Sequence, residues 1–338
     1  MTQQMGSGKG KLPLGLVPFV LCLLISSAAA EPSLERIQTI DLVGKAGKLD
    51  HLIVDGKSGR LFQANKVNNT LDVVDLKTGK LLTQIKGQAG IQGLAYAADL
   101  DRLFAGLGTG GYCNIFDGKN YKLLKTVKFT DDADNVRYHP RTRMVYVAHA
   151  EKGLGVIDGQ ALEKKADINL PGSAESFQLE SGRPRLYLNI PSPTQVVVID
   201  TDKNEVVKSY PLKMAAANYA LALDEPNHRL FIGCRKKPMV VVMDSETGGE
   251  ITGVGIPADT DDLFYDAKRR RIYVSCGEGY IAVIRQVDAD HYEFLDPVPT
   301  VKDARTCYFE PETGRLYLAV PRQPDKKGPE IWVYKARP

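Results

Sequence analysis

The chain has 338 residues, of which 43% are hydrophobic and 25% are charged. This composition is that of an ordinary globular protein with a large core and excludes a disordered or fibrous one. Lys and Arg total 44 against 41 Asp and Glu, so the net charge is only +3. That charge is too weak to attract nucleic acid or an anionic membrane strongly, and we expect neither as a partner.

The first 30 residues have the pattern of a secretory signal peptide. Lys9 and Lys11 precede an apolar run at 12–25, and small residues follow as far as Ala30. The run is shorter than the roughly 20 residues of a membrane-spanning helix, and no later stretch is long enough to cross a membrane. We expect cleavage after Ala30, a secreted or periplasmic location, and a mature net charge of +1, because residues 1–30 contain two lysines and no acidic residue.

A short pattern, an arginine followed by an aliphatic and an aromatic residue, recurs along the chain at spacings of 41–44 residues. The seven aromatic residues are Phe62, Phe104, Tyr146, Tyr187, Phe231, Tyr273 and Tyr317, and in the third copy the arginine, Arg143, stands one residue further from the aromatic. A second element, an apolar run, ends at Asp75, Asp117, Asp158, Asp200 and Asp244 in five units and at Arg285 and Lys335 in the last two. Self-similarity of this period indicates a repeat architecture.

Each unit is predicted to contain four short strands. In the first unit, strands are expected at 52–54, 61–64, 71–74 and 81–85, with turns rich in Gly, Asp, Ser and Lys between them. Paired helices of similar repeat length are the alternative, but 31 Gly and 19 Pro interrupt the chain too often for them. Seven four-stranded units of this length predict an all-β, seven-bladed β-propeller with antiparallel blades.

The two ends of the chain are expected to share one blade. The last unit runs out after a third strand at 331–334, whereas residues 34–42 have no unit of their own. We predict that residues 34–42 supply the outer strand of the last blade, so that the ring closes without an open edge. Residues 31–338 then form a single domain, which we expect to be a monomer.

Residues 60–65 (RLFQAN) and 69–80 (NTLDVVDLKTGK) resemble the repeat of the YVTN-type seven-bladed propellers, and weaker versions stand at 146–149 and 187–189. The resemblance covers nearly all of residues 34–338 and implies the propeller fold. Members of that family are mostly secreted or surface proteins without an established catalytic motif. The resemblance therefore implies no functional residue.

Residues that other propellers use for cofactors are missing. Trp332 is the only tryptophan and is followed by Val333, which argues against WD repeats and against quinone sites that use tryptophan in most blades. No Cys-x-x-Cys-His motif is present for covalent haem, and five histidines are too few for a multinuclear copper cluster. We expect no cofactor, and a divalent cation is the possibility that stays open.

Four cysteines follow residue 30, which permits up to two disulfides in a secreted protein. Cys234 and Cys276 occupy equivalent places in adjacent blades, about 10 Å apart and beyond the roughly 7 Å limit between bridged Cα atoms. Cys276 with Cys307 is the pair that could form a bridge. Buried free thiols, Cys113 included, are the favoured alternative.

In a propeller the innermost strand of each blade starts at one face, here called the upper face, and its first residues surround the opening of the central channel, here called the channel mouth. Every blade has polar residues at this point. The candidate ligand-binding residues are Asp50, His51, Gln92, Asp134, Asn135, Glu175, Asn218, Asp261, Asp262 and Arg305. Converging carboxylates repel one another and raise their pKa values unless a cation or Arg305 offsets them. The pattern favours a metal ion, a cation or a polyhydroxyl ligand, although polar strand starts that merely cap the sheets are an alternative.

Two functions fit this pattern. The first is a binding module that contacts a small molecule, a peptide or a protein through the upper face. The alternative is a metal-assisted lactonase or related hydrolase, in which a cation held by Asp134, Glu175 and Asp261 polarises an ester carbonyl. The binding module is favoured, because the carboxylates lack the spacing of a metal motif and no Gly-x-Ser-x-Gly elbow is present; no catalytic residue is assigned.

Several other polar residues are expected to have structural or solvent-exposed roles. His139 and His228 fall in turns of the opposite face, whereas His149 falls in an upper-face loop and is a secondary candidate. Residues 235–237 (RKK) are expected to be a solvated basic loop. The arginine that precedes each aromatic recurs in every unit and is therefore predicted to be a scaffold residue.

Overall fold

A computed structural model describes residues 1–10, 32–150 and 152–338. The chain divides into two units, Met1–Glu31 and Pro32–Pro338. Residues 1–10 are exposed and have no regular secondary structure, and the rest of the predicted signal peptide lies outside the described residues. In the described ranges, no helix has the length and apolar character that a bilayer crossing requires.

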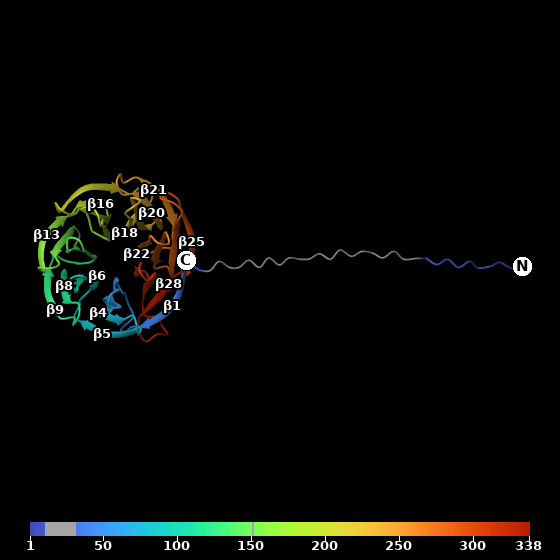
Figure 1. Ribbon diagram of the computed structural model, residues 1–338, viewed down its shortest axis with the longest axis horizontal. Helices are drawn as coiled ribbons and strands as arrows, with labels where there is room; N and C mark the ends of the chain where they lie inside the picture. The colour runs from blue at the N-terminus through green and yellow to red at the C-terminus, as the bar shows by residue number, and fades with distance from the viewer. Residues whose placement is uncertain (11–31, 151) are drawn as a thin grey trace. The chain divides into compact units, whose positions relative to one another are not determined.

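The described part of the second unit forms seven four-stranded antiparallel sheets arranged as a ring (Figure 1), which confirms the predicted fold. Blades 1–3 are β2–β5 (Leu52–Asp55, Arg60–Asn65, Thr70–Asp75, Lys80–Lys86), β6–β9 (Ile91–Ala97, Arg102–Leu107, Tyr112–Asp117, Leu123–Lys128) and β10–β13 (Val136–His139, Met144–His149, Gly153–Asp158, Glu163–Asn169). Blades 4–6 are β14–β17 (Phe177–Leu179, Arg185–Pro191, Thr194–Asp200, Glu205–Pro211), β18–β21 (Ala216–Asp224, Arg229–Lys236, Met239–Asp244, Glu250–Gly255) and β22–β25 (Thr260–Asp266, Arg271–Cys276, Tyr280–Gln286, Tyr292–Pro299). Blade 7 consists of β26 (Cys307–Glu310), β27 (Arg315–Val320), β28 (Glu330–Ala336) and β1 (Leu34–Asp41), and a 3₁₀ turn, η1 (Lys66–Asn68), lies between β3 and β4.

The ring is closed by the two ends of the propeller unit, as predicted. Strand β1 pairs antiparallel with β28, in a register that sets Leu34 against Ala336 and Ile40 against Ile331. Figure 1 shows the first strand and the last strand side by side in the same blade. The pairing covers the edge of blade 7 that would otherwise present unpaired backbone groups.

Hydrophobic clusters between neighbouring blades hold the ring together. The aromatic residue of every repeat is buried, with at most 2% of its surface exposed. Phe62, for example, contributes to a cluster that includes Leu94 and Leu103 of the next blade. Burial of one such side chain contributes about 1.5–3 kcal/mol. The aromatic residue recurs every 41–44 residues because each blade buries one such ring against its neighbour.

The arginine before the aromatic connects consecutive blades. In five blades it bonds to the turn after the third strand of the next blade, in the pairs Arg60–Gly118 O, Arg102–Gln160 O, Arg185–Glu246, Arg229–Asp290 and Arg271–Arg337 O. Arg143 instead bonds back to Asp99 of the preceding blade. In these six blades the arginine has the scaffold role predicted for it.

The four cysteines of the described propeller are buried and free. Cys276 and Cys307 therefore do not form the bridge that the sequence left open. Burial raises the pKa of Cys113 and Cys234 to about 12. A thiol with so high a pKa is not ionised near neutral pH, and it packs as a small apolar group.

Candidate ligand-binding channel

Seven of the ten predicted residues interact at the channel mouth, either directly or through their charges. They are Asp50, His51, Asp134, Glu175, Asp261, Asp262 and Arg305. The other three, Gln92, Asn135 and Asn218, are nearly or fully buried; the side chains of Gln92 and Asn218 bond elsewhere, and Gln92 reaches Asp50 through Lys66. Gln92 accepts a hydrogen bond from Lys66 and donates one to Asp132 Oδ1 (2.9 Å). Asn218 donates to Asn189 Oδ1 (3.0 Å) and thereby connects blade 5 to blade 4.

Two lysines neutralise the carboxylate of Asp50. Its side chain is only 3% exposed, and Oδ2 lies 3.0 Å from Lys48 Nζ and 3.5 Å from Lys66 Nζ. Burial alone would raise the pKa of Asp50, but the charges of His51, Lys48 and Lys66 hold it below the usual range. Both lysines lie outside the innermost strands, Lys66 in η1, so the sequence pattern did not indicate them.

Two arginines enclose the carboxylate of Asp261. Arg235 Nη2 lies 2.6 Å from Asp261 Oδ1, and Arg305 Nε lies 3.2 Å from Asp261 Oδ2. Arg305 Nη1 also reaches Asp259 Oδ2 at 2.8 Å. The predicted solvated loop at 235–237 was wrong for Arg235, because β19 continues to Lys236 and carries this side chain to the mouth, where its guanidinium stacks on Tyr219 at 3.8 Å from the ring centre.

His51 connects the first blade to the sixth. Its Nδ1 lies 3.3 Å from both carboxylate oxygens of Asp262, and Asp262 Oδ2 also accepts a hydrogen bond from the backbone N–H of Cys307 at 3.0 Å. Burial opposes a charge on His51, but Asp262 and Asp50 outweigh it and raise the pKa of His51 to about 10. The imidazole is therefore protonated at neutral pH and paired with Asp262.

Two acidic side chains of the mouth are not matched by a neighbouring cation. Burial, reinforced by the charge of Asp50, raises the pKa of Asp134 to about 6, and its Oδ1 has no hydrogen-bond partner. Burial and the charges of Asp134 and Asp261 raise the pKa of Glu175 to about 8. The repulsion expected from the sequence thus acts on these two groups. Burial and the charge of Asp50 also raise the pKa of Asp261, although Arg235 opposes this shift, whereas Asp50 and Asp262 are compensated by cations of the chain itself.

The described residues contain no group of three or more His, Cys, Asp or Glu side chains that could hold a metal ion. Asp134, Glu175 and Asp261, the predicted metal ligands, are not gathered into such a group, and Asp261 is occupied by Arg235 and Arg305.

The central channel contains a cavity of about 410 Å³ to which all seven innermost strands contribute. Pockets that bind small molecules have volumes of about 300–1,000 Å³. His51 and Asp262 lie at the end nearer the mouth, and the exposed Pro140, just after β10, lies at the opposite end. The cavity is thus reached from the lower face, where the innermost strands end.

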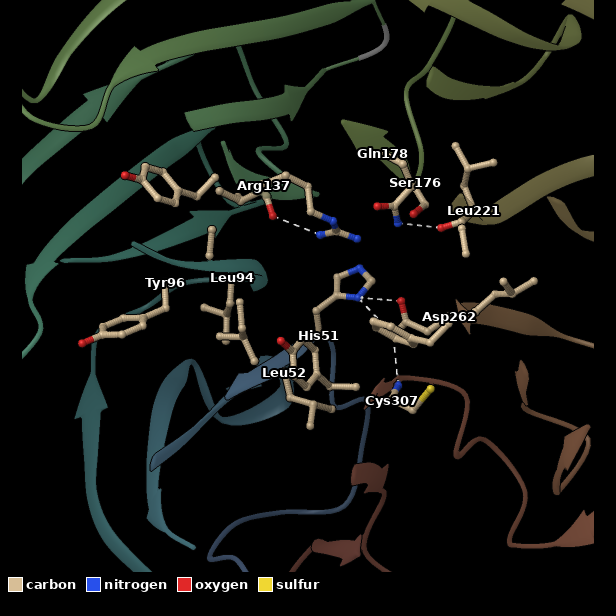
Figure 2. A pocket seen from close by; sticks show the side chains of 18 of the residues that line it. His51, Leu52, Leu94, Tyr96, Arg137, Ser176, Gln178, Leu221, Asp262 and Cys307 are labelled. Carbon is tan, nitrogen blue, oxygen red and sulfur yellow. Dashed lines mark hydrogen bonds and ion pairs between the residues drawn. The ribbon is translucent and has the colours of Figure 1, made fainter. Parts of the chain in front are cut away.

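One charged residue of the cavity wall was not predicted. Arg137 lies in β10, and Figure 2 shows its guanidinium in the middle of the cavity, facing the imidazole of His51. It donates a hydrogen bond to the carbonyl of Val136 at 3.0 Å and lies 5.7 Å from the ring centre of Phe177. Burial lowers the pKa of Arg137, although Asp262 opposes this shift.

The strand register provides the signal that would have found Arg137. In each blade, one residue of the innermost strand lies opposite the repeat aromatic. These residues are Ile53, Ala95, Arg137, Gln178, Ala222, Phe264 and Tyr308. All seven line the cavity, and among these described positions Arg137 alone is charged. In the first blade this residue, Ile53, precedes its aromatic partner Phe62 by nine residues, and Arg137 precedes Tyr146 by the same number. The register of one blade is therefore enough to identify Arg137.

The remaining histidines lie outside the cavity wall. His139 Nε2 is 3.1 Å from the carbonyl oxygen of Glu180, in keeping with the structural role predicted for it. His149, the secondary candidate, is buried, and its Nε2 lies 2.6 Å from Asp167 Oδ1. His228 is on the lower face. None of them contributes to the site described above.

No family model matches the sequence. Curated relatives include the YncE protein of Salmonella typhi, 26% identical over 186 residues, and that of Salmonella typhimurium, 24% identical over 185 residues, both described as uncharacterized. Each alignment covers 53% of this chain and 51% of the relative, so the chain spans about half the length of the curated relatives it matches. The chain is thus distantly related to YncE over about half of its length.

Solved structures show the same fold at low identity. Hydrazine synthase of Kuenenia stuttgartiensis superposes with a TM-score of 0.71 at 15% identity, covering 84% of this chain and 96% of that one. The WD40 repeats of RRP9 superpose with a TM-score of 0.76 at 11% identity, covering 90% and 98%. Identities this low establish the propeller architecture and carry nothing about activity.

Proposed function

We propose that this protein is a binding module that holds a small molecule in its central channel. The observation that carries the proposal is the cavity of about 410 Å³, whose wall comes from all seven blades. Its upper end is crowded with ion pairs such as Asp50–Lys48 and Asp261–Arg235. Concave, largely apolar sites with a few convergent polar groups are typical of small-molecule pockets.

The contacts at the mouth favour binding over metal-assisted hydrolysis. A metal ion at Asp261 would have to displace two arginines, at 2.6 and 3.2 Å, from its carboxylate. Cys307 lines the cavity, but burial raises its pKa well above that of an ordinary thiol, so it is not poised as a nucleophile. The side chains around the cavity are suited to hold a ligand rather than to transform one.

The compartment in which this binding takes place follows from residues 1–30. We propose that the protein acts outside the cytoplasm, secreted or in the periplasm, because basic, apolar and small residues follow one another there in the order of a signal peptide. Mass spectrometry of the mature protein tests this. A new N-terminus at Glu31 in the periplasmic or secreted fraction supports export, and a protein found only in the cytoplasmic fraction with Met1 intact contradicts it.

Ligand-observed NMR against a library of small organic acids, amines and alcohols tests channel binding. Gln178→Trp and Ile53→Trp each place an indole in the cavity wall, and Val207→Trp, at an exposed position of β17 that does not line the cavity, is the matched control. Wild type and control should bind the same compounds, and both wall variants should lose them. A wild-type protein that binds no compound, or wall variants that bind as well as the control, would overturn the proposal.

A further inference from the structure

We propose that the ligand of the channel is a small organic carboxylate with an apolar or aromatic body, and that Arg137 is its anchor. This inference rests on the proposed function, and it adds the chemical class of the ligand and the residue that selects it.

The first step concerns the unmet bonding capacity of Arg137. Within the described residues, no Asp or Glu forms an ion pair with its guanidinium, and its hydrogen bond goes to Val136 O, the carbonyl of its own neighbour in sequence. A guanidinium has five N–H donors. Arg137 is partly buried and faces the cavity, so most of its donors are left to whatever enters the cavity, and an anion there would pair with them.

The second step concerns the other charges that face the cavity. His51, which faces Arg137 in Figure 2, is a cation, but Asp262 at 3.3 Å compensates it. Asp262 in turn is fully engaged by His51 and by the N–H of Cys307. Among the described residues that line the cavity, Arg137 is therefore the one charged side chain without an ion-pair partner. One negative charge, brought by a ligand, would balance it.

The third step concerns the kind of anion. The planar fork of one guanidinium matches one carboxylate in a bidentate pair. A phosphate dianion would need a second free cation, and His51 is already paired. A monocarboxylate is therefore the anion that fits the charge of the cavity.

The fourth step concerns the rest of the ligand. Around the cavity, Figure 2 shows Leu52, Leu94 and Leu221. Phe264 and Tyr308 are among the aromatic residues of its wall. The volume of about 410 Å³ exceeds what a bare carboxylate group needs. A ligand with an apolar or aromatic body would use the carboxylate for orientation and the body for burial of apolar surface.

Calorimetric titration with benzoate, benzyl alcohol and benzylamine tests the inference, because these probes share a ring and differ in charge. Benzoate should bind at least tenfold more tightly than the alcohol, and benzylamine should bind most weakly. Arg137→Gln should weaken benzoate binding by about tenfold to a hundredfold, the loss expected for a hydrogen-bonded charge. Arg141→Gln, which removes an exposed arginine four residues later, should leave benzoate binding unchanged.

Folding of the variants keeps the test decisive. Because Arg137 has no acidic partner, Arg137→Gln should melt at or above the wild-type temperature in the absence of ligand. Arg137→Lys, which keeps the charge without the fork, should bind benzoate with intermediate affinity. If Arg137→Gln does not fold, a shift of the Arg137 side-chain N–H resonance on adding benzoate to the wild type supports the anchor, and an unmoved resonance overturns it.

The outcomes separate the two proposals. If benzyl alcohol binds as tightly as benzoate and Gln178→Trp abolishes both, the channel binds small molecules but the carboxylate inference is wrong. If benzoate binds and Arg137→Gln binds it equally well, the anchor is wrong. If no compound in the library binds, both proposals fail.

Discussion

Nδ1 of His51 in blade 1 lies 3.3 Å from Oδ1 of Asp262 in blade 6, although blade 7 stands between these blades in the ring. Asp262 also accepts a hydrogen bond from the backbone of Cys307 in blade 7. One carboxylate thus joins three consecutive blades where their innermost strands begin. The closure of the ring depends on this contact as well as on the strand pairing at its edge.

Replacing this carboxylate should destabilise the fold. Asp262→Asn leaves the protonated His51 without its counter-charge in a buried site, which we expect to cost about 3 kcal/mol. Urea unfolding followed by tryptophan fluorescence of Trp332 measures the loss. Asp290→Asn, which removes an exposed carboxylate, should change the free energy of unfolding by about 1 kcal/mol or less. Equal effects of the two substitutions would contradict the importance assigned to Asp262.

The pKa of His51 predicts a loss of stability in alkali. Its folded-state value of about 10 exceeds the ordinary value of 6.5. The stabilisation is therefore fully present below pH 6.5 and is lost as the pH rises to 10. His51→Gln should be less stable than wild type at pH 6, and the gap between the two proteins should close towards pH 10. Thermal melting of both proteins across this range measures the gap, and a constant gap would show that His51 is not charged in the folded state.

Glu175 predicts the opposite behaviour. Because burial raises its pKa from 4.5 to about 8, the folded protein binds its proton more tightly than the unfolded chain does. The folded state therefore pays a penalty that is absent below pH 4.5 and grows as the pH rises to 8. Glu175→Gln should melt at the wild-type temperature at pH 4 and several degrees higher at pH 8. Glu163→Gln, an exposed glutamate of β13, is the control and should melt like wild type at both pH values.

The shared blade predicts a strong contrast within one strand. Ile40 of β1 is 1% exposed and belongs to the hydrophobic cluster between blades 7 and 1, whereas Ile37 is 45% exposed. Ile40→Ala should lower the free energy of unfolding by about 2–5 kcal/mol, and Ile37→Ala should change it by about 0.5 kcal/mol or less. Denaturant unfolding of the two variants is the measurement. Comparable losses would mean that β1 is not packed as described.

The fold could be predicted almost completely from the sequence, because each blade buries one aromatic residue at a fixed place and the period is visible without coordinates. Ring closure was predictable from the missing fourth strand of the last unit and the unassigned residues 34–42. The four strands predicted in the first unit are present, each one or two residues longer than expected.

The candidate site could be predicted only in part. The innermost strand starts identified Asp50, His51 and Asp262. Lys48 precedes β2 and Lys66 lies in η1, in connecting segments where no periodicity points to them. Arg137 was not predicted for another reason. It lies within a strand, and only the register opposite Tyr146 shows that it faces the channel.

The pairing of β1 with β28 also orders events during synthesis. The strand made first must wait, without its partner, until almost the last residues of the propeller have been translated. Contacts so distant along the chain form late, so an incomplete polypeptide keeps a bare sheet edge that attracts other chains and proteases. A chain that stops before β28 would be removed or would aggregate, and the complete ring thereby serves as a check on the completeness of its own translation.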